Sequence, residues 1–414
     1  MRGKGKSGVG KTAPRKKLGR IDQEIYPLAS AILCRSIQDV SQIMKRMTSD
    51  EIDVVAVERS SGEKYTGGTS CPVHCLTCKS NRESGEVSLV AKVVEIDEDH
   101  PWKRDIKCRS YNVELAFYKS AIPVLLASGA AVPSLVCSEV KPKGTVFTFV
   151  LTDLRNKFPH HPQGFSWNTL VAAARWLASL HAAFWGCSRE PPGLWSCGSH
   201  WDLEKHGEDG LKRLSSGWAE TLRWLGKRSS ELAADPAVRA LGSRLQAAAV
   251  PISRFAHGEI CKVSWRQFRT VIHGDAKPAN FFFTDGSSRA EAAACDFQFA
   301  GEGYGAADLA YMLFPDANSD LLDREEELLG IYHAELSQRL GHRGAAFTPE
   351  VLRRHYAVAQ LDFFRHFVGK SGWVASRPAD AELVRRMSRG LAALDGGECL
   401  SPKEYELRLL ADYG

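Results

Sequence analysis

The sequence predicts an α+β fold in which a small, strand-rich part comes first and a larger, mainly helical part follows. Before residue 152, short apolar runs with the alternation of strands are separated by turns. From residue 166 onward, apolar residues recur at helical spacing over long stretches. A hairpin-like segment, residues 271–298, interrupts these helices. A chain of 414 residues has room for two or three lobes, each with its own core.

Five strands, and a short helix before the first of them, are expected in the first part. Residues 37–49 have the apolar spacing of a short helix. The expected strands cover residues 53–59, 72–78, 87–94, 133–137 and 144–151. The third of them carries Lys92 in an otherwise apolar run, where a charge needs a partner. A Gly67–Gly68 turn precedes this strand, and its backbone amides could approach a phosphate because neither residue has a side chain to obstruct them.

Helices are expected through most of the second part. Ser166 is placed to cap a helix that runs to Phe184, and His181 on its apolar stripe is expected to be a hydrogen-bonded core histidine. Residues 186–202 read as an aromatic loop. Further helical patterns cover residues 203–250 and 321–340, and another helix is expected to begin at residues 308–311. Residues 356–367 are markedly aromatic.

Residues 271–298 organise the chain. Two apolar runs flank an Asp285–Gly286 turn, which is the local signature of a β-hairpin. Its ends carry the polar residues His273, Asp275, Lys277, Asn280 and Asp296. A strand pair is a stiff support that would bring Asp275, Asn280 and Asp296 together. Two oxygen ligands for a hard divalent cation, with one free carboxylate to orient a hydroxyl, are what phosphoryl transfer from Mg-ATP requires.

These residues resemble a known catalytic core. His273-Gly274-Asp275 followed by Asn280, and then Asp296-Phe297-Gln298, look like the core of small-molecule kinases with a protein-kinase-like fold. That superfamily includes the aminoglycoside phosphotransferases, the choline kinases and the ecdysteroid kinase-like (CHK kinase-like) group. The Asp-Phe-Gln form and the later Gly305–Tyr311 run resemble the last group most. Protein kinases have a related loop, but they place Arg at the position of Gly274 and Gly at that of Gln298.

The resemblance implies a two-lobed protein-kinase-like architecture. Residues 1–25 would form a basic disordered tail, and residues 26–151 a small N-lobe built on an antiparallel sheet. Residues 152–155 would be the hinge, and residues 156–414 a large, mainly helical C-lobe. This division is an expectation about domain organisation that follows from the resemblance.

The resemblance also implies how a nucleotide would be held. Lys92 would bridge the α- and β-phosphates of ATP while paired with Glu114 of the following helix. The Gly67–Gly68 turn would lie over the phosphates. Thr152 and Asp153 would cradle adenine through their backbone groups.

The resemblance further implies that the polar side chains of segment 271–298 carry out the reaction. Asp296 and Asn280 would hold Mg²⁺, and Asp275 would accept or orient the proton of the acceptor hydroxyl. Lys277 would contact the γ-phosphate. ATP and Mg²⁺ are therefore the expected cofactors.

Other residues are expected to support this site. His273 would fix the catalytic loop by hydrogen bonding, and Asp308 would brace the same loop from the next helix. Trp195, His200 and Trp201 of the aromatic loop are candidates for a place near the acceptor, although ordinary packing explains them equally well.

The function that follows is an ATP-dependent phosphotransferase acting on the hydroxyl of a small molecule, such as a sterol-, choline- or aminoglycoside-like alcohol. A protein Ser/Thr kinase is an alternative, but the 14 residues from Phe297 to Ala310 leave little room for an activation segment. A catalytically weak, nucleotide-binding pseudokinase is another. It is disfavoured because all the expected polar positions are filled.

Composition limits the remaining classes. Residues 1–20 hold eight of the Lys and Arg residues and no acid, although the net charge of the whole chain is only +5, so the body does not indicate polyanion binding. We expect no nucleic-acid partner beyond weak contacts of the tail, no membrane span and a monomer. Eleven scattered cysteines favour a reducing, cytoplasmic location. The basic tail leaves nuclear or organellar targeting open.

Two motifs invite other interpretations. Residues 5–12 match the pattern of a phosphate loop, but no strand precedes them and Pro14 follows, so a solvated tail is favoured. Cys71, Cys75 and Cys78 with His74 suggest zinc. No second close cysteine pair is nearby and strand alternation splits these residues between two faces, so a strand with buried thiols is favoured.

Overall fold

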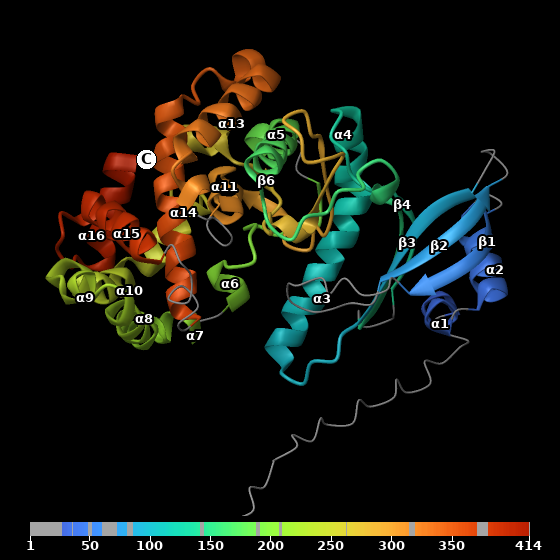
Figure 1. Ribbon diagram of the computed structural model, residues 1–414, viewed down its shortest axis with the longest axis horizontal. Coiled ribbons are helices and arrows are strands. Elements are labelled where there is room, and N and C mark those ends of the chain that lie inside the picture. The colour runs from blue at the N-terminus through green and yellow to red at the C-terminus, as the bar shows by residue number, and fades with distance from the viewer. Residues whose placement is uncertain are drawn as a thin grey trace, which may run out of the picture.

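The computed structural model shows a two-lobed molecule, with the sheet-containing lobe at one end and the helical lobe at the other (Figure 1). It describes residues 27–34, 36–48, 52–59, 73–80, 86–140, 145–187, 191–206, 209–261, 263–313, 319–370 and 380–413. The basic tail, the Gly67–Gly68 turn and Cys71 lie outside the described residues, so the expectations placed on them stay predictions. The predicted α+β, protein-kinase-like fold class is confirmed.

The N-lobe is built on one antiparallel sheet of five strands in the order β1-β2-β3-β5-β4. The strands are β1 Ile52–Arg59, β2 Val73–Ser80, β3 Glu86–Glu95, β4 Leu135–Val140 and β5 Val146–Thr152. All five expected strands are present, with ends shifted by up to three residues. In the central strand β3, Leu89, Ala91 and Val93 are buried on one face. Lys92 therefore points to the opposite face, because successive side chains of a strand alternate.

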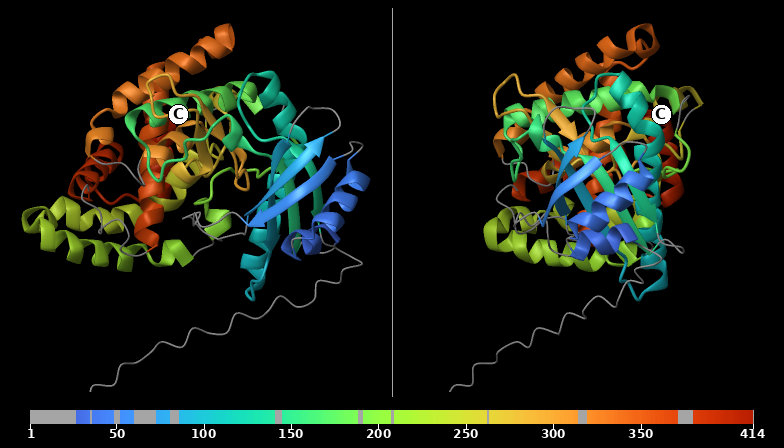
Figure 2. Two further views of the ribbon diagram at one scale, coloured as in Figure 1. Left: turned by 45° about the vertical axis from the view of Figure 1, so that its right-hand side comes forward. Right: turned by 90° about the vertical axis from the view of Figure 1, so that its right-hand side faces the viewer.

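Helices cover both faces of this sheet (Figure 2). The helices α1 (Pro27–Cys34) and α2 (Ile37–Met47) pack on the outer face, where they share a core with Leu89, Ala91 and Val93. The other face meets α3 (Pro101–Ala116). This helix continues through a π-helical turn, Phe117–Ala121, into α4 (Ile122–Ala127). Helix α2 confirms the helix expected at residues 37–49, whereas α1 was not predicted.

The C-lobe is a helical body. Its α-helices are α5 Trp167–Ala183, α6 Leu203–His206, α7 Asp209–Lys212, α8 Leu214–Arg228, α9 Ser230–Ala234, α10 Pro236–Ala256, α11 Ala306–Leu313, α12 Ser319–Leu322, α13 Glu325–Leu340, α14 Pro349–Gly369, α15 Asp380–Asp395 and α16 Pro402–Arg408. Short 3₁₀ turns cover Leu154–Asn156, Trp185–Cys187, Val263–Phe268, Pro278–Asn280 and Gly341–Gly344, and a π-helical turn covers Leu409–Tyr413. No helix of the described residues is both long enough and apolar enough to cross a membrane.

Helix α5 is the central helix of this lobe. Ser166 caps it with a full capping box, in which its side chain and that of Thr169 each bond the other's backbone. Small and apolar residues make the helix buried along almost its whole length. His181 is fully buried, with Nδ1 2.8 Å from the Tyr332 hydroxyl and Nε2 3.2 Å from Asp308. The prediction of a hydrogen-bonded core histidine is confirmed.

Two small sheets carry the segment that organises the sequence. Strand β6 (Thr270–Ile272) pairs with β9 (Gly301–Gly303), and β7 (Phe281–Phe283) pairs with β8 (Ala292–Ala294). The predicted hairpin is confirmed for β7 and β8, but its loop covers residues 284–291. This loop contains Asp285 and Gly286, and the earlier apolar run, Val271 and Ile272, pairs with β9 instead. The polar positions 273–280 thus lie between two strands that belong to different sheets.

Candidate active site

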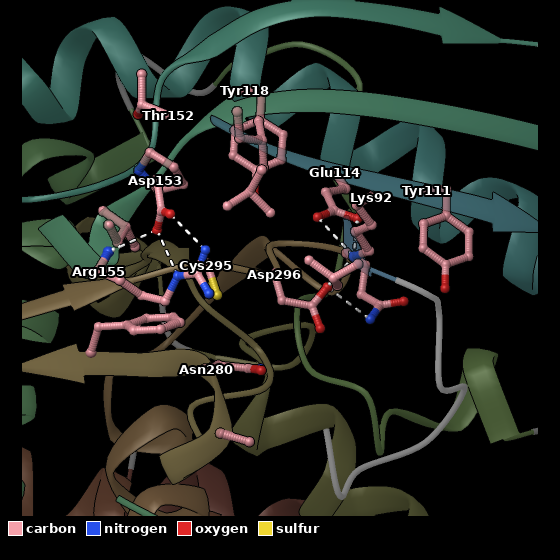
Figure 3. A pocket seen from close by; sticks show the side chains of 18 of the residues that line it. Lys92, Tyr111, Glu114, Tyr118, Thr152, Asp153, Arg155, Asn280, Cys295 and Asp296 are labelled. Atoms are coloured by element: carbon pink, nitrogen blue, oxygen red, sulfur yellow. Dashed lines mark hydrogen bonds and ion pairs between the residues drawn. The ribbon is translucent and has the colours of Figure 1, made fainter. Parts of the chain in front are cut away.

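A cavity lies between the two lobes and has a volume of about 1020 Å³, counting its mouth to solvent. Strand β3, helix α3, the end of β5 and the segment around β7 and β8 form its walls (Figure 3). Most of the residues predicted for the site from the sequence line it: Lys92, Glu114, Thr152, Asp153, Lys277, Asn280 and Asp296. Residues more than 200 positions apart therefore meet in one pocket.

A buried ion cluster joins the two lobes inside this pocket. Lys92 Nζ lies 3.0 and 2.9 Å from the two Glu114 carboxylate oxygens and 2.8 Å from Asp296 Oδ1. Burial disfavours the charged form of Lys92, but Asp296 and Glu114 outweigh it and raise its pKa well above the ordinary value. Burial also opposes ionisation of Asp296, yet the charge of Lys92 lowers the pKa of this carboxyl. Lysine and aspartate are therefore both charged at neutral pH.

Glu114 is the most deeply buried member of the cluster, with no exposed surface. Burial raises its pKa to about 7, although Lys92 pulls that pKa down. Strand β3 supplies the lysine and helix α3 the glutamate, so the pair ties the helix to the sheet. This is the partner that the sequence predicts for Lys92.

Asp296 follows β8 and has an unusual backbone. Its φ is +67°, in the left-handed region that few residues other than glycine, asparagine and aspartate adopt. Among the described residues, only Ser199 shares a positive φ without being glycine. The next residue, Phe297, stacks on Phe117 of the N-lobe with ring centroids 4.0 Å apart. The strained turn thus aims the carboxylate into the pocket while the phenylalanine packs against the end of α3.

Asp275 lies at the edge of the pocket and is held by three donors. Its Oδ1 accepts from the Tyr311 hydroxyl at 3.0 Å, and its Oδ2 accepts from Lys277 at 2.8 Å and from Asn280 at 3.0 Å. The side chain is almost fully buried. Such contacts fix the carboxylate in one orientation, as a group that positions a substrate hydroxyl requires.

Hydrogen bonds to α11 and to the residue before Asp296 hold the loop that carries Asp275. Asp308 accepts hydrogen bonds from the backbone N–H groups of His273 at 2.7 Å and Gly274 at 2.8 Å. His273 Nε2 lies 3.1 Å from the Cys295 carbonyl, next to Asp296. Gly274 has φ +77°, and a Cβ there would lie 2.2 Å from the Phe299 carbonyl oxygen. The glycine that distinguishes this loop from that of protein kinases is therefore required by close backbone packing.

The oxygen donors of the pocket fit a magnesium ion. The Asp296 carboxylate and the Asn280 side-chain amide both line the cavity. Asn280 uses its Nδ2 as donor to the Asp275 carbonyl and carboxylate, so its amide oxygen is the atom that would ligate a cation. Carboxylate and amide oxygens are hard ligands of the kind that Mg²⁺ takes together with substrate phosphates.

The two hinge residues, Thr152 and Asp153, use different groups in hydrogen bonds within the protein. The side chain of Asp153 accepts from Ser88 at 2.7 Å and from the Arg155 backbone and guanidinium, so it stabilises the hinge itself. The Thr152 N–H donates to the Ser134 carbonyl at 3.0 Å, and this amide is not available to adenine. The expectation that both residues cradle adenine through their backbone groups stays a prediction, from which the Thr152 N–H is excluded.

The aromatic loop reaches the opposite side of Asp275. The His200 N–H donates to the Gly274 carbonyl at 2.9 Å, and His200 Nδ1 lies 3.7 Å from Asp275 Oδ1. Trp195 and Trp201 are instead fully buried and donate to the Gln298 carbonyl and to Asp362. Of the three candidates named for the acceptor side, only the histidine faces the aspartate.

Some residues of this side were missed from the sequence. The rings of His200 and Tyr311 are 4.8 Å apart, and those of His206 and His366 are 4.5 Å apart. Burial lowers the pKa of His200 and His366 well below the ordinary value, and that of His206 to about 4. These imidazoles are neutral at pH 7. Tyr311 could have been found, because it stands one helical turn after Asp308 and so shares its face of α11.

Comparisons with known proteins find one family and several solved structures to which this chain is similar. The model of the ecdysteroid kinase-like family matches residues 62–344, more than half of the chain. No curated protein matches the sequence. Solved structures with similarity include a microcompartment-associated aminopropanol kinase, with 14% identity, 90% of this chain and 96% of that chain covered, and a TM-score of 0.37.

Two further structures show similar values. A type VIII aminoglycoside-3'-phosphotransferase has 19% identity, 80% and 98% coverage and a TM-score of 0.39. Choline kinase from Cryptosporidium parvum Iowa II has 11% identity, 83% and 92% coverage and a TM-score of 0.40. At these values none of the three indicates the substrate of this chain. The match of the family to most of the sequence is sufficient by itself: the chain belongs to the ecdysteroid kinase-like family.

Proposed function

We propose that this protein is an ATP-dependent phosphotransferase that moves the γ-phosphate of Mg-ATP to a hydroxyl of a small molecule. One observation carries the proposal. Lys92, Glu114, Asp296 and Asn280 line one pocket between the lobes, and Asp275 lies at its edge with its carboxylate fixed. This set supplies charge neutralisation, oxygen ligands and a group for the hydroxyl, which phosphoryl transfer needs together.

Each residue has a role that follows from its position. Lys92, held by Glu114, would bind the α- and β-phosphates. Asp296 and Asn280 would hold Mg²⁺, which when bound offsets the negative charge of the phosphates. Asp275 would orient the acceptor hydroxyl and accept its proton. We also propose that residues 26–151 and 156–414 are the two lobes, joined by a hinge at 152–155.

Lys277 links the two halves of the site. Its Nζ lies 2.8 Å from Asp275 Oδ2, and its side chain also lines the nucleotide pocket. Burial opposes its charge, but Asp275 outweighs burial and raises the pKa of the lysine. A permanent cation between the carboxylate and the γ-phosphate would draw the two reactants together, which supports the role expected for this residue.

The charge around Asp275 favours a neutral acceptor. Its described neighbours on the acceptor side are the uncharged His200 and Tyr311 together with the cation Lys277. Lys370 adds positive charge nearby, because it interacts electrostatically with Asp275 and Lys277. A cationic amino alcohol or aminoglycoside would meet these cations, so a neutral hydroxylated molecule such as a sterol-like alcohol fits better.

The test is an ATP-consumption screen over hydroxylated metabolites that includes neutral polyols and sterols, choline-type alcohols and aminoglycosides. Asp275→Ala serves as the blank. We expect Mg²⁺-dependent turnover with a neutral acceptor and none with the blank. A protein that binds ATP, seen as a thermal shift, but shows no turnover with any acceptor would be a pseudokinase. Equal turnover by wild type and blank would refute the assignment of Asp275.

A further inference from the structure

A second cluster of ligand-type side chains lies behind the loop that carries His200. One atom from each of Cys197, Asp202 and His257 lies within 4.8 Å of the other two. All three residues are at least 95% buried. The Cys197 Sγ–H donates to Asp202 Oδ2 at 3.1 Å. The cysteine and the aspartate flank the loop turn before α6, whereas the histidine follows the C-terminal end of α10.

The histidine of this cluster is arranged as a metal ligand would be. Its Nε2 lies 3.1 Å from Asp362 Oδ2, and Asp362 is itself held by Arg365 at 2.8 Å and by the Trp201 indole at 2.9 Å. His257 Nδ1 is buried and has no hydrogen-bond partner within the described part of the chain. When Nε2 carries the proton that it donates to Asp362, Nδ1 presents a bare lone pair. A carboxylate on the remote nitrogen is the arrangement that orients metal-binding histidines.

A lysine lies beside these ligand atoms but does not contact all of them. Lys205 Nζ donates to the Cys197 carbonyl at 2.6 Å and lies 3.5 Å from Asp202 Oδ1. The lysine therefore occupies the first carboxylate oxygen, and the second faces the thiol. With Asp362 and Arg365 paired to each other, a thiolate and one carboxylate would face an incoming ion. The thiolate and the carboxylate would supply two negative charges to a divalent cation, and Lys205 would offset one of them.

We propose that Cys197 Sγ, Asp202 Oδ2 and His257 Nδ1 bind one Zn²⁺ ion. Sulfur, nitrogen and carboxylate oxygen together are the donor set of zinc, and the thiolate disfavours the harder Mg²⁺ and Ca²⁺. On binding, the Cys197 S–H bond breaks and its proton leaves to solvent, so that a sulfur–zinc bond forms. Three protein ligands leave the fourth tetrahedral position to a water molecule. The site is separate from the magnesium ligands of the nucleotide pocket.

Zinc here would fix the part of the loop that reaches the catalytic residues. Ser199 and His200 lie between two of the ligands, and Ser199 has φ +85°. The Ser199 and His200 N–H groups donate to the carbonyls of Phe299 and Gly274, at 3.1 and 2.9 Å. An ion that ties this turn to the end of α10 would hold the strained backbone, and with it the position of His200 beside Asp275.

The full-length protein tests this directly. After incubation with zinc chloride and removal of free metal, elemental analysis should find about one zinc per chain in the wild type. Cys197→Ser and His257→Gln should lose it, whereas Cys137→Ser, which removes a buried thiol of the N-lobe, should keep it. Zinc should raise the melting temperature of the wild type but not that of Cys197→Ser.

Two further measurements keep the proposal testable if a variant folds poorly. Wild-type protein loaded with Co²⁺ should show a thiolate-to-cobalt charge-transfer absorption, and its absence would overturn the site. Asp362→Asn, with folding checked by circular dichroism, should weaken zinc binding about 10- to 100-fold in competition with a chelator. Unchanged affinity would refute the assignment of His257 as a ligand. A wild type without zinc, or equal zinc in Cys197→Ser, would refute the proposal as a whole.

Discussion

The two sides of Asp275 differ in the charge of the side chains that line them. On the nucleotide side, Lys92, Glu114 and Asp296 form a compact ion cluster with contacts of 2.8 to 3.0 Å. On the acceptor side, burial keeps His200 and its neighbouring imidazoles uncharged at neutral pH. Under the proposed function, the first side would hold a polyanion and its metal, and the second would hold a substrate without positive charge. The difference in charge would then separate recognition of the donor from recognition of the acceptor.

The largest expected effect is on the chemistry where the two sides meet. Asp275→Ala and Asp296→Ala should each remove about 3 to 5 kcal/mol of transition-state stabilisation, because in the proposed function Asp275 would orient the hydroxyl and Asp296 would hold the metal. A coupled ATP-turnover assay measures the loss, with circular dichroism to establish folding. Asp285→Ala, on the exposed loop 284–291, is the matched control and should keep full activity. Wild-type turnover in either site variant would contradict the proposed function.

A second expected effect is on stability at acid pH and concerns the acceptor side. Burial, with the charge of Lys370 as the next cause, lowers the pKa of His206 in the folded protein to about 4, from the ordinary 6.5. Below pH 6.5 the unfolded chain takes up a proton that the folded chain does not. The free energy of unfolding should therefore fall as the pH drops from about 6.5 to 4, by up to about 3 kcal/mol from this group.

Urea unfolding of His206→Gln across this pH range measures that contribution. The variant should lose less stability on acidification than the wild type. His200 and His366 keep part of the dependence, because their pKa values are lowered in the same direction. His342→Gln, at an exposed turn, is the control and should follow the wild type. Identical pH profiles for His206→Gln and wild type would show that the imidazole is not held neutral.

On the nucleotide side, the coupling between Lys92 and Glu114 should be smaller but measurable. Lys92→Met should raise KM for ATP and lower kcat, whereas Glu114→Gln should act mainly by releasing the lysine. A double-mutant cycle on kcat/KM should therefore show a coupling energy of about 1 to 3 kcal/mol. Lys79→Met, an exposed lysine of the same sheet, controls for general charge loss. Additive effects of the two substitutions would mean that the ion pair does not position the lysine.

The smallest effect should be on acceptor binding. His200→Phe keeps an aromatic ring beside Tyr311 but removes the polar nitrogen that lies 3.7 Å from Asp275. We expect KM for the acceptor to rise roughly five-fold, which corresponds to a loss of about 1 kcal/mol of binding free energy. KM for ATP should not change, because the histidine does not line the nucleotide pocket. A change in KM for ATP alone would remove His200 from the acceptor side.

The two sides also differ in how much of them the sequence predicts. The nucleotide and metal residues stand in short motifs, His273 to Asn280 and Asp296 to Gln298, and their spacing is set by β7 and β8. Lys92 was expected to have a partner because an apolar strand cannot hold an unpaired charge, and the resemblance identified Glu114 as that partner. The N-lobe strands followed from alternation and turn residues, whereas the two-lobed protein-kinase-like fold class was implied by the resemblance to a known family.

The acceptor side could not be predicted in the same way. His206 and His366 come from α6 and α14, 160 positions apart, and neither belongs to a motif. Tertiary packing alone brings their rings together. The hinge gives a second example. The Thr152 N–H donates to the Ser134 carbonyl and so cannot bind adenine, and this hydrogen bond depends on the path of the neighbouring chain segment. Trp195 and Trp201 had an aromatic pattern that fits a binding surface or a core, and burial places them in the core.

The left-handed backbone at Asp296 has a consequence for how this lineage can change. Asparagine and glycine adopt that conformation as readily as aspartate does. A single substitution to either would remove the metal carboxylate and leave the turn, and with it the stacking of Phe297, undisturbed. Such a substitution would also remove the carboxylate that lies 2.8 Å from Lys92, so Glu114 would remain as the lysine's carboxylate partner in this cluster. Under the proposed function, a descendant with Asn or Gly at position 296 would keep the backbone turn but lose the metal ligand.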